Sequence, residues 1–175
     1  MLLYKNELDS ILSSEDCSKC RFCCSFRRCS LWETPLFELD LAEKLKKIFP
    51  EAEFKFFEDF ATINIDDCYK TIDPEEEALC WFNKGKGCIL GDDKPFDCSV
   101  WPLRVMRKNN ELVIALSSGC KVISSKPLHK IKKILDDGLE EKLLEYAKRF
   151  PAFVKDYRGD YVVLKTLEED LITDE

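Results

Sequence analysis

The sequence predicts an α+β protein with a small, irregular cysteine-rich centre and a β-hairpin, covered by two or three helices. Three observations carry this prediction. Most of the ten cysteines fall into two groups, two apolar segments flank a short polar run, and two longer segments repeat apolar residues at helical spacing. We expect residues 1–175 to form a single domain, in which 15–125 hold the cysteines and 126–150 form a buttressing helix.

The first half of the chain contains two predicted helices and a strand. A short leading helix is expected within residues 1–16, before the polar run Ser13–Asp16. A second helix is expected to begin at Thr34–Pro35 and to end before Pro50. Its apolar stripe would consist of Phe37, Leu41, Leu45 and Ile48. The alternation in Thr62–Ile65 predicts a strand with Cys68 just beyond its end.

The second half predicts a hairpin, a long helix and an edge strand. Strands are expected over 103–106 and 112–116, and a turn between Asn109 and Asn110 would place Cys98 and Cys120 almost opposite each other. The helix 126–150 has its apolar face interrupted at Gly138, which is expected to loosen or divide it. The one histidine, His129, lies in the first turn, where a surface role is expected. Residues 161–164 are expected to add an edge strand.

The densest cysteine group is Cys17, Cys20, Cys23 and Cys24, which is followed by Cys29. Thiolates two residues apart can turn toward one point, and zinc sites and iron–sulfur clusters are both held in this way. Neighbouring side chains tend to point apart, so we expect Cys23 and Cys24 to serve different sites. The nearby cations Lys19, Arg21, Arg27 and Arg28 would favour thiolate over thiol.

The second cysteine group begins at Cys80 and continues through Cys88 to Cys98. The glycines at 85 and 87 suit a tight turn that would bring Cys80 and Cys88 back toward each other. Acidic residues 73–77 before this group are expected to form a solvated surface turn. The two groups together form the candidate ligand set.

Composition narrows the kind of protein. The formal net charge of -7 and the pI near 5.0 argue against a nucleic-acid partner, and no apolar run approaches the length of a membrane span. The start lacks the apolar core of a signal peptide, so we expect a cytoplasmic protein whose cysteines are ligands. A disulfide knot, or inert buried cysteines, is the alternative. With one histidine, a multi-ligand site must be nearly all thiolate.

The cysteine pattern resembles the CxxCxxCC family of zinc- or iron-chelating cysteine-cluster domains. Cys17, Cys20, Cys23 and Cys24 fit its signature, while the later positions are matched by Cys80, Cys88, Cys98 and Cys120. The resemblance covers roughly residues 15–125. The chain departs from the family in having Lys94 before Pro95, where an arginine is usual, and in its extra cysteines Cys29 and Cys68. The resemblance implies a bound metal and no particular reaction.

The spacing Cys-x-x-Cys-x-x-Cys with a remote fourth cysteine favours a [4Fe–4S] cluster over zinc. Our hypothesis places Cys17, Cys20 and Cys23 with one later cysteine on one cluster, and Cys24 with the remaining thiols. The protein would then be a redox or cluster-handling accessory to a protein partner. A zinc-stapled interaction module is the alternative. An enzyme similar to the flagellin lysine methylases with this signature is a further alternative. The chain has neither a glycine-rich cofactor fingerprint nor a nucleophile–histidine–acid set to support it.

Overall fold

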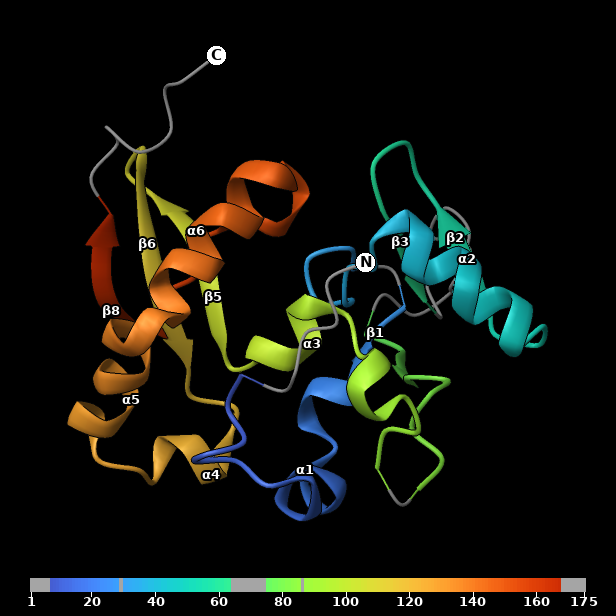
Figure 1. Ribbon diagram of the computed structural model, residues 1–175, viewed down its shortest axis with the longest axis horizontal. Coiled ribbons are helices and arrows are strands. Elements are labelled where there is room, and N and C mark those ends of the chain that lie inside the picture. Colours follow the sequence, from blue (N-terminus) through green and yellow to red (C-terminus); the bar gives the residue numbers. More distant parts are fainter. Residues whose placement is uncertain (1–6, 29, 64–74, 86, 168–175) are drawn as a thin grey trace. The chain divides into compact units, whose positions relative to one another are not determined.

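The computed structural model describes residues 7–28, 30–63, 75–85 and 87–167, and the chain divides into two compact units, Met1–Ser99 and Val100–Glu175 (Figure 1). Both units combine helices with small sheets, which confirms the α+β class. Because the chain divides into two units, its organisation as one domain stays a prediction.

The first unit opens with a turn and a short helix that begins later than expected. Residues 7–11 form a turn in which Leu12 N–H donates to the Leu8 carbonyl at 2.8 Å, and helix α1 spans Ser14–Cys20. Ser13 caps this helix reciprocally with Asp16, whose carboxylate reaches back to the Ser13 backbone N–H. The predicted leading helix is thus wrong over its described residues, because the polar run expected to end a helix instead supplies an N-cap. Residues 1–6 lie outside the described part.

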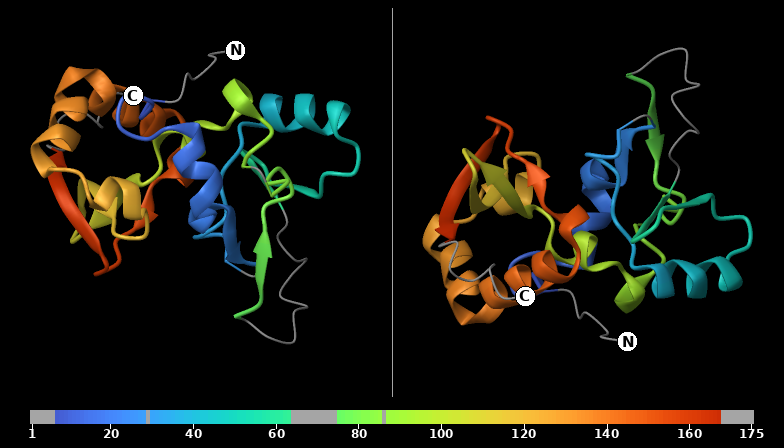
Figure 2. Two further views of the ribbon diagram at one scale, coloured as in Figure 1. Left: turned by 90° about the horizontal axis from the view of Figure 1, so that it is seen from below. Right: turned by 90° about the horizontal axis from the view of Figure 1, so that it is seen from above.

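The first cysteine group continues from α1 through a sharp bend. Arg21 caps α1 with a left-handed backbone (φ 55°), and the 3-10 turn η1 spans Phe22–Cys24. Strand β1 (Ser25–Arg27) follows at once and pairs antiparallel with β4 (Glu77–Leu79). Arg27 also forms ion pairs with Glu33 and Glu75. The paired strands lie side by side in both views of Figure 2.

The second predicted helix is shorter than expected. Helix α2 spans Leu39–Ile48, because the preceding segment is extended: Phe37 forms an isolated bridge with Ala61. The buried face of α2 consists of Ala42 and Leu45, whereas Ile48 is 53% exposed, so the predicted stripe is only partly correct. Strands β2 (Phe54–Phe56) and β3 (Ala61–Ile63) pair antiparallel. The strand predicted over 62–65 is confirmed over its first two residues, and the rest lies outside the described residues, as does Cys68.

The core of the first unit is aromatic and reaches the cysteines. Phe37 and Phe82 are buried with ring centroids 6.1 Å apart, and Phe54 packs edge-on against Phe37 at 5.2 Å. Cys80 and Cys88 pack against this same cluster. The second cysteine group is therefore attached directly to the hydrophobic core. The unit ends with the 3-10 turn η2 (Gly91–Asp93) and helix α3 (Phe96–Val100), whose last residue belongs to the second unit.

The second unit contains the predicted hairpin, with the predicted register. Strands β5 (Leu103–Lys108) and β6 (Glu111–Ser117) pair antiparallel from Leu103↔Leu116 to Lys108↔Glu111, and Asn109 and Asn110 turn with positive φ. Strand β8 (Tyr161–Leu167) adds the predicted edge, while the two-residue parallel strand β7 (Lys155–Asp156) was not predicted. Cys98 lies in helix α3, so it does not continue β5 as the extrapolated ladder required.

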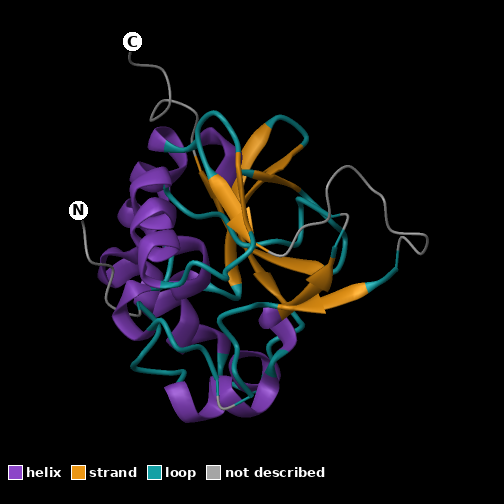
Figure 3. Ribbon diagram, turned by 90° about the vertical axis from the view of Figure 1, so that its right-hand side faces the viewer, coloured by secondary structure: helices purple, strands orange, loops and turns teal. Residues whose placement is uncertain are grey.

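The long predicted helix is divided, as expected, at Gly138. After α4 (Lys121–Ser124), helix α5 spans Leu128–Ile134, a π-helical turn η3 spans Leu135–Leu139, and α6 spans Glu140–Arg149 before the 3-10 turn η4 (Pro151–Phe153). Gly138 has φ 114°, which interrupts the helix. Helices α5 and α6 lie along one face of the β7–β5–β6–β8 sheet (Figures 2 and 3). His129 is exposed in the first turn of α5, as predicted.

Among the helices of the described residues, none combines the length and the apolar character that crossing a membrane requires.

Candidate metal centre

The register of the β1–β4 ladder brings the two cysteine groups together. Ser25 pairs with Leu79, so the next position places Cys24 opposite Cys80. The Cys80 backbone N–H donates to the Cys24 carbonyl at 2.6 Å, which extends the ladder by one bond. These two cysteines, 56 positions apart in sequence, therefore become neighbours through main-chain pairing alone.

A glycine turn then folds Cys88 back and contacts the first group. Asn83 and Cys88 form an isolated antiparallel bridge, and Gly85 and Gly87 have φ of 85° and 101°. A Cβ placed on Gly87 would lie 3.0 Å from the Ser18 Cβ, and the Arg21 guanidinium donates to the Gly85 carbonyl at 2.8 Å. The turn expected from the glycines is confirmed. Its tip contacts the helix that carries Cys17 and Cys20.

Cys23 and Cys24 are in contact, contrary to the expectation that neighbouring side chains point apart. Both lie in the single 3-10 turn η1, and their thiols share a hydrogen bond. That bond raises the pKa of Cys23 well above its ordinary value and is the main reason that the pKa of Cys24 falls to about 6. Being neighbours does not decide which ligand set each cysteine joins, so their assignment to different sites stays a prediction.

Burial raises the pKa of three further thiols near Cys24 and so favours their protonated form. Loss of solvent raises the pKa of Cys80 to about 12 and also raises the pKa of Cys88 and of Cys98. The negative charge of Asp97 adds to the effect on Cys98. Each of these thiols also responds to the charge of Cys24, and Cys98 responds to Cys80 and Cys88. Cys24, Cys80, Cys88 and Cys98, called the inner thiols below, are therefore mutual neighbours.

The backbone near two of these sulfurs favours their charged form. Interactions with the backbone N–H groups of Phe82 and Asn83 lower the pKa of Cys80, and an interaction with that of Leu90 lowers the pKa of Cys88. Both interactions oppose the effect of burial on the thiol pKa. Such donors stabilise a sulfur that carries negative charge, as a metal-bound thiolate does. The donor chemistry around the inner thiols therefore fits a thiolate-bound metal.

The remaining predicted ligands are arranged less uniformly. Cys17 and Cys20 lie three residues apart on α1, and Cys17 is close enough to affect the pKa of Cys23, whereas Cys20 is exposed. Cys120 is buried immediately before α4 in the second unit, so its place in the centre stays a prediction. Cys29 lies outside the described residues. The eight cysteines that the structure describes are free thiols, which leaves the disulfide alternative without support among them.

The thiols are neighbours without forming a closed ligand shell. Over residues 7–28, 30–63, 75–85 and 87–167, no three His, Cys, Asp or Glu side chains converge closely enough to hold a metal ion. A metal that binds these sulfurs would therefore have to draw them inward, in exchange for the protons that burial keeps on them.

Two residues near the thiols were missed by the sequence reasoning. Lys94 lowers the pKa of Cys24 and of Cys88, whereas the sequence predicted this effect for the cations of the first group. Of those cations, Lys19 pairs with Glu15 and Arg27 with Glu33. Asn83 is buried, and its side-chain amide also lowers the pKa of Cys24. Both residues lie within the second cysteine group, and Lys94 also occupies the position where the resembling family usually has an arginine, which was the signal in the sequence.

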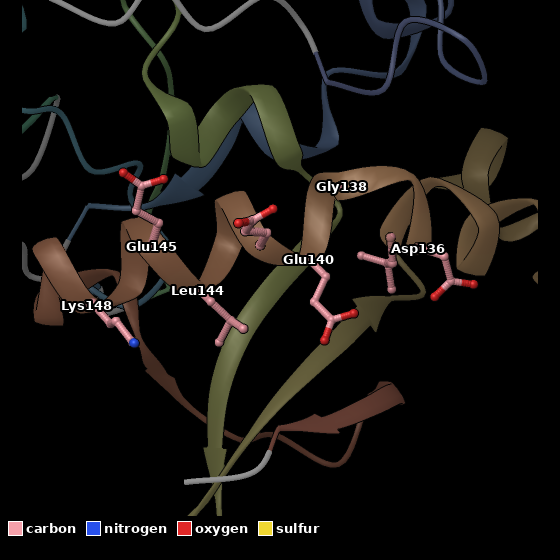
Figure 4. A pocket seen from close by; sticks show the side chains of 8 residues that line it. Asp136, Gly138, Glu140, Leu144, Glu145 and Lys148 are labelled. Carbon is pink, nitrogen blue, oxygen red and sulfur yellow. The ribbon is translucent and has the colours of Figure 1, made fainter. Parts of the chain in front are cut away.

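A separate hollow of about 550 Å³ lies on the helical layer of the second unit. Asp136, Glu140, Glu141 and Glu145 contribute carboxylates to its lining, and Lys148 contributes one cation. Figure 4 shows these side chains spread along the divided helix around Gly138, without converging on a point. Glu140 pairs with Lys165 of β8. The hollow is acidic and open, and it contains no cysteine.

Comparison of the chain with protein-family models, with curated proteins and with solved structures found no match.

Proposed function

We propose that this chain is a metal-binding protein in which cysteine thiolates hold an iron–sulfur cluster of the [4Fe–4S] type. It acts as a redox or cluster-handling accessory to a partner protein. The observation that carries this proposal is the set of inner thiols, Cys24, Cys80, Cys88 and Cys98, which come from three separate segments and affect each other's ionisation. An all-thiolate donor set selects iron–sulfur clusters or zinc among the common biological metals.

The first cysteine group supports a cluster in particular. Cys17 and Cys20 on one face of α1, followed by Cys23 beyond the left-handed Arg21, present the Cys-x-x-Cys-x-x-Cys spacing at the surface of the unit. Phe22 between them is 53% exposed, and Ile89 beside Cys88 is 44% exposed. Exposed apolar side chains beside candidate ligands, of which Cys20 and Cys23 are themselves exposed, offer a partner protein access to the cluster.

Zinc is the second candidate, and a specific observation favours it. The inner thiols number four, as in a structural four-cysteine zinc site, and two of them, Cys80 and Cys88, pack against the hydrophobic core. In that case the metal would staple the β1–β4 ladder, the glycine turn and α3 together, and the protein would be an interaction module. The colour of the purified protein and its content of inorganic sulfide distinguish the two candidate metal centres.

The deciding experiment is anaerobic purification followed by measurement of iron, acid-labile sulfide, zinc and the visible spectrum. The proposal expects about four irons and four sulfides per chain, with a brown absorption that dithionite bleaches. One or two zinc ions per chain without colour would establish the zinc module instead. A protein without either metal, both as purified and after anaerobic reconstitution, would overturn the metal-binding function.

Two variants connect that measurement to the ligands. Cys20→Ala should lower the iron content if the first group holds the cluster, and Cys98→Ala should lower it if the inner thiols do. Ser30→Ala, a substitution of similar size close to the first group, is the control and should keep the wild-type content. Unchanged iron in Cys20→Ala would remove the first group from the assignment.

A further inference from the structure

Asn83 is a buried polar residue in the middle of the inner thiols. Its exposed fraction is 5%, its backbone N–H donates to the Cys80 carbonyl at 2.8 Å, and it forms the isolated bridge with Cys88. Its side-chain amide is close enough to the Cys24 sulfur to lower the pKa of that thiol. One residue is thus in contact with three of the four inner cysteines.

The orientation of this amide is fixed by the glycine turn. The Gly85 backbone N–H donates to Asn83 Oδ1 at 3.0 Å, which identifies the oxygen end and leaves Nδ2 on the other side. Nδ2 is buried and has no hydrogen-bond acceptor of ordinary geometry in the described ranges of the chain. Burying an amide donor without an acceptor costs about 1–3 kcal/mol, so natural proteins rarely leave one in this state without a role.

We propose that Asn83 is a positioning residue of the metal centre, whose Nδ2–H group donates a hydrogen bond to the Cys24 sulfur when that sulfur is a metal ligand. This inference rests on the proposed function and adds a named residue to it. As a metal ligand the Cys24 sulfur keeps negative charge, so it can accept the hydrogen bond that Nδ2 does not make in the described ranges of the chain. The hydrogen bond holds the Cys24 sulfur in place and withdraws charge from it.

The test uses cobalt(II) as the probe, with Asn83→Asp and Asn83→Leu as a pair of variants. Aspartate keeps the oxygen that caps the Gly85 N–H, whereas leucine keeps the shape and adds no charge. The loss that the two share is the Nδ2–H donor. Both should therefore move the sulfur-to-cobalt charge-transfer band to longer wavelength, and Asn83→Leu should bind cobalt about 10–100-fold more weakly than wild type. Asn110→Asp, the same chemical change in the hairpin turn of the second unit, should leave both quantities unchanged.

A second measurement needs no substitution. In protein loaded with cadmium-113, an amide proton of Asn83 should show scalar coupling to the metal across the Cys24 sulfur, alongside any coupling of the Phe82 backbone N–H to the metal across the Cys80 sulfur. Wild-type protein that takes up neither probe would overturn the proposed function and this inference with it. Loaded protein with an unshifted band in both variants, and without coupling to Asn83 side-chain protons, would overturn the role of Asn83 alone.

Discussion

At the scale of single residues, the ionisation of the inner thiols is set by tertiary burial. Cys80 is the clearest case, because desolvation raises its pKa to about 12 despite two backbone N–H donors. Cys24 is the opposite case: the thiol of Cys23, and then Asn83 and Lys94, bring its pKa to about 6. The pKa shifts therefore run in opposite directions: the pKa of Cys24 is lowered, whereas the pKa values of Cys80, Cys88 and Cys98 are raised.

This difference predicts how metal binding depends on pH. At pH 6–8 Cys80, Cys88 and Cys98 must each lose a proton when they bind metal, because their folded pKa values are raised. Cys24 is largely deprotonated above pH 7 and releases little. Affinity for zinc should therefore rise with pH, by about tenfold per pH unit for each thiol that is deprotonated.

Competition titrations with zinc at several pH values measure this slope, and calorimetry in buffers of different ionisation heat counts the released protons. An affinity that stayed constant between pH 6 and pH 8 would mean that the raised thiols are not ligands. In a Cys80→Ala variant that still binds zinc, the slope of the logarithm of affinity against pH should be smaller by about one, because one proton fewer is released.

At the scale of elements, the contact between α1 and the glycine turn decides whether the two cysteine groups meet. Gly87 combines a positive φ with an approach to Ser18 that leaves no space for a Cβ. Gly91 has φ 55° in open space, and Gly159 has open space without a positive φ. Alanine substitutions at these three positions therefore distinguish the free-energy cost of backbone strain from that of the close contact.

We expect Gly87→Ala to be the most damaging substitution of the three. It should cost about 3 kcal/mol, from the left-handed backbone and from the forced displacement of α1. Gly91→Ala should cost about 1 kcal/mol from its backbone alone. Gly159→Ala should stay within about 0.5 kcal/mol of wild type.

Denaturant unfolding and metal content, measured on the same preparations, test this order. Only Gly87→Ala should also lower the metal content, because only there does the added Cβ separate the turn from the helix that carries Cys17. Equal stability losses at positions 87 and 91 would show that the contact with Ser18 contributes nothing.

At the scale of the whole molecule, we expect the two units to differ in how much their stability depends on the proposed metal. The sheet of the second unit has buried residues of its own, including Leu103, Val113 and Ile114. In the first unit Cys80 and Cys88 pack against an aromatic core, and short elements of three to ten residues make up the described secondary structure. Short elements gain little stability on their own, so a bound metal contributes more there.

Hydrogen exchange before and after removal of the metal with a chelator tests this difference. We expect residues 14–27 and 77–98 to lose protection by about tenfold or more, while 103–117 and 161–167 keep theirs. Equal loss in both units would instead show that Cys120 is a ligand that couples them. That result would favour the single-domain organisation, and Cys120→Ser should then reproduce it in the presence of metal.

The sequence by itself determined the features that depend on local patterns. The hairpin register follows from two apolar strands around Asn109 and Asn110, whose type tolerates the positive φ of the turn. The division of the long helix follows from Gly138, and the turn that returns Cys88 follows from Gly85 and Gly87. The choice of cysteines as the candidate site needed only their spacing and number.

The tertiary structure alone decided which thiols are neighbours and in which state. Cys24 lies opposite Cys80 because β1 pairs with β4, and the short, irregular strand sequences do not reveal this long-range pairing. The misplaced leading helix has a local cause instead: the Ser13–Asp16 pair caps a helix that begins there and outweighs the apolar spacing before it. Burial and the contacts of Asn83 and Lys94 set the thiol pKa values, and both arise only when distant segments come together.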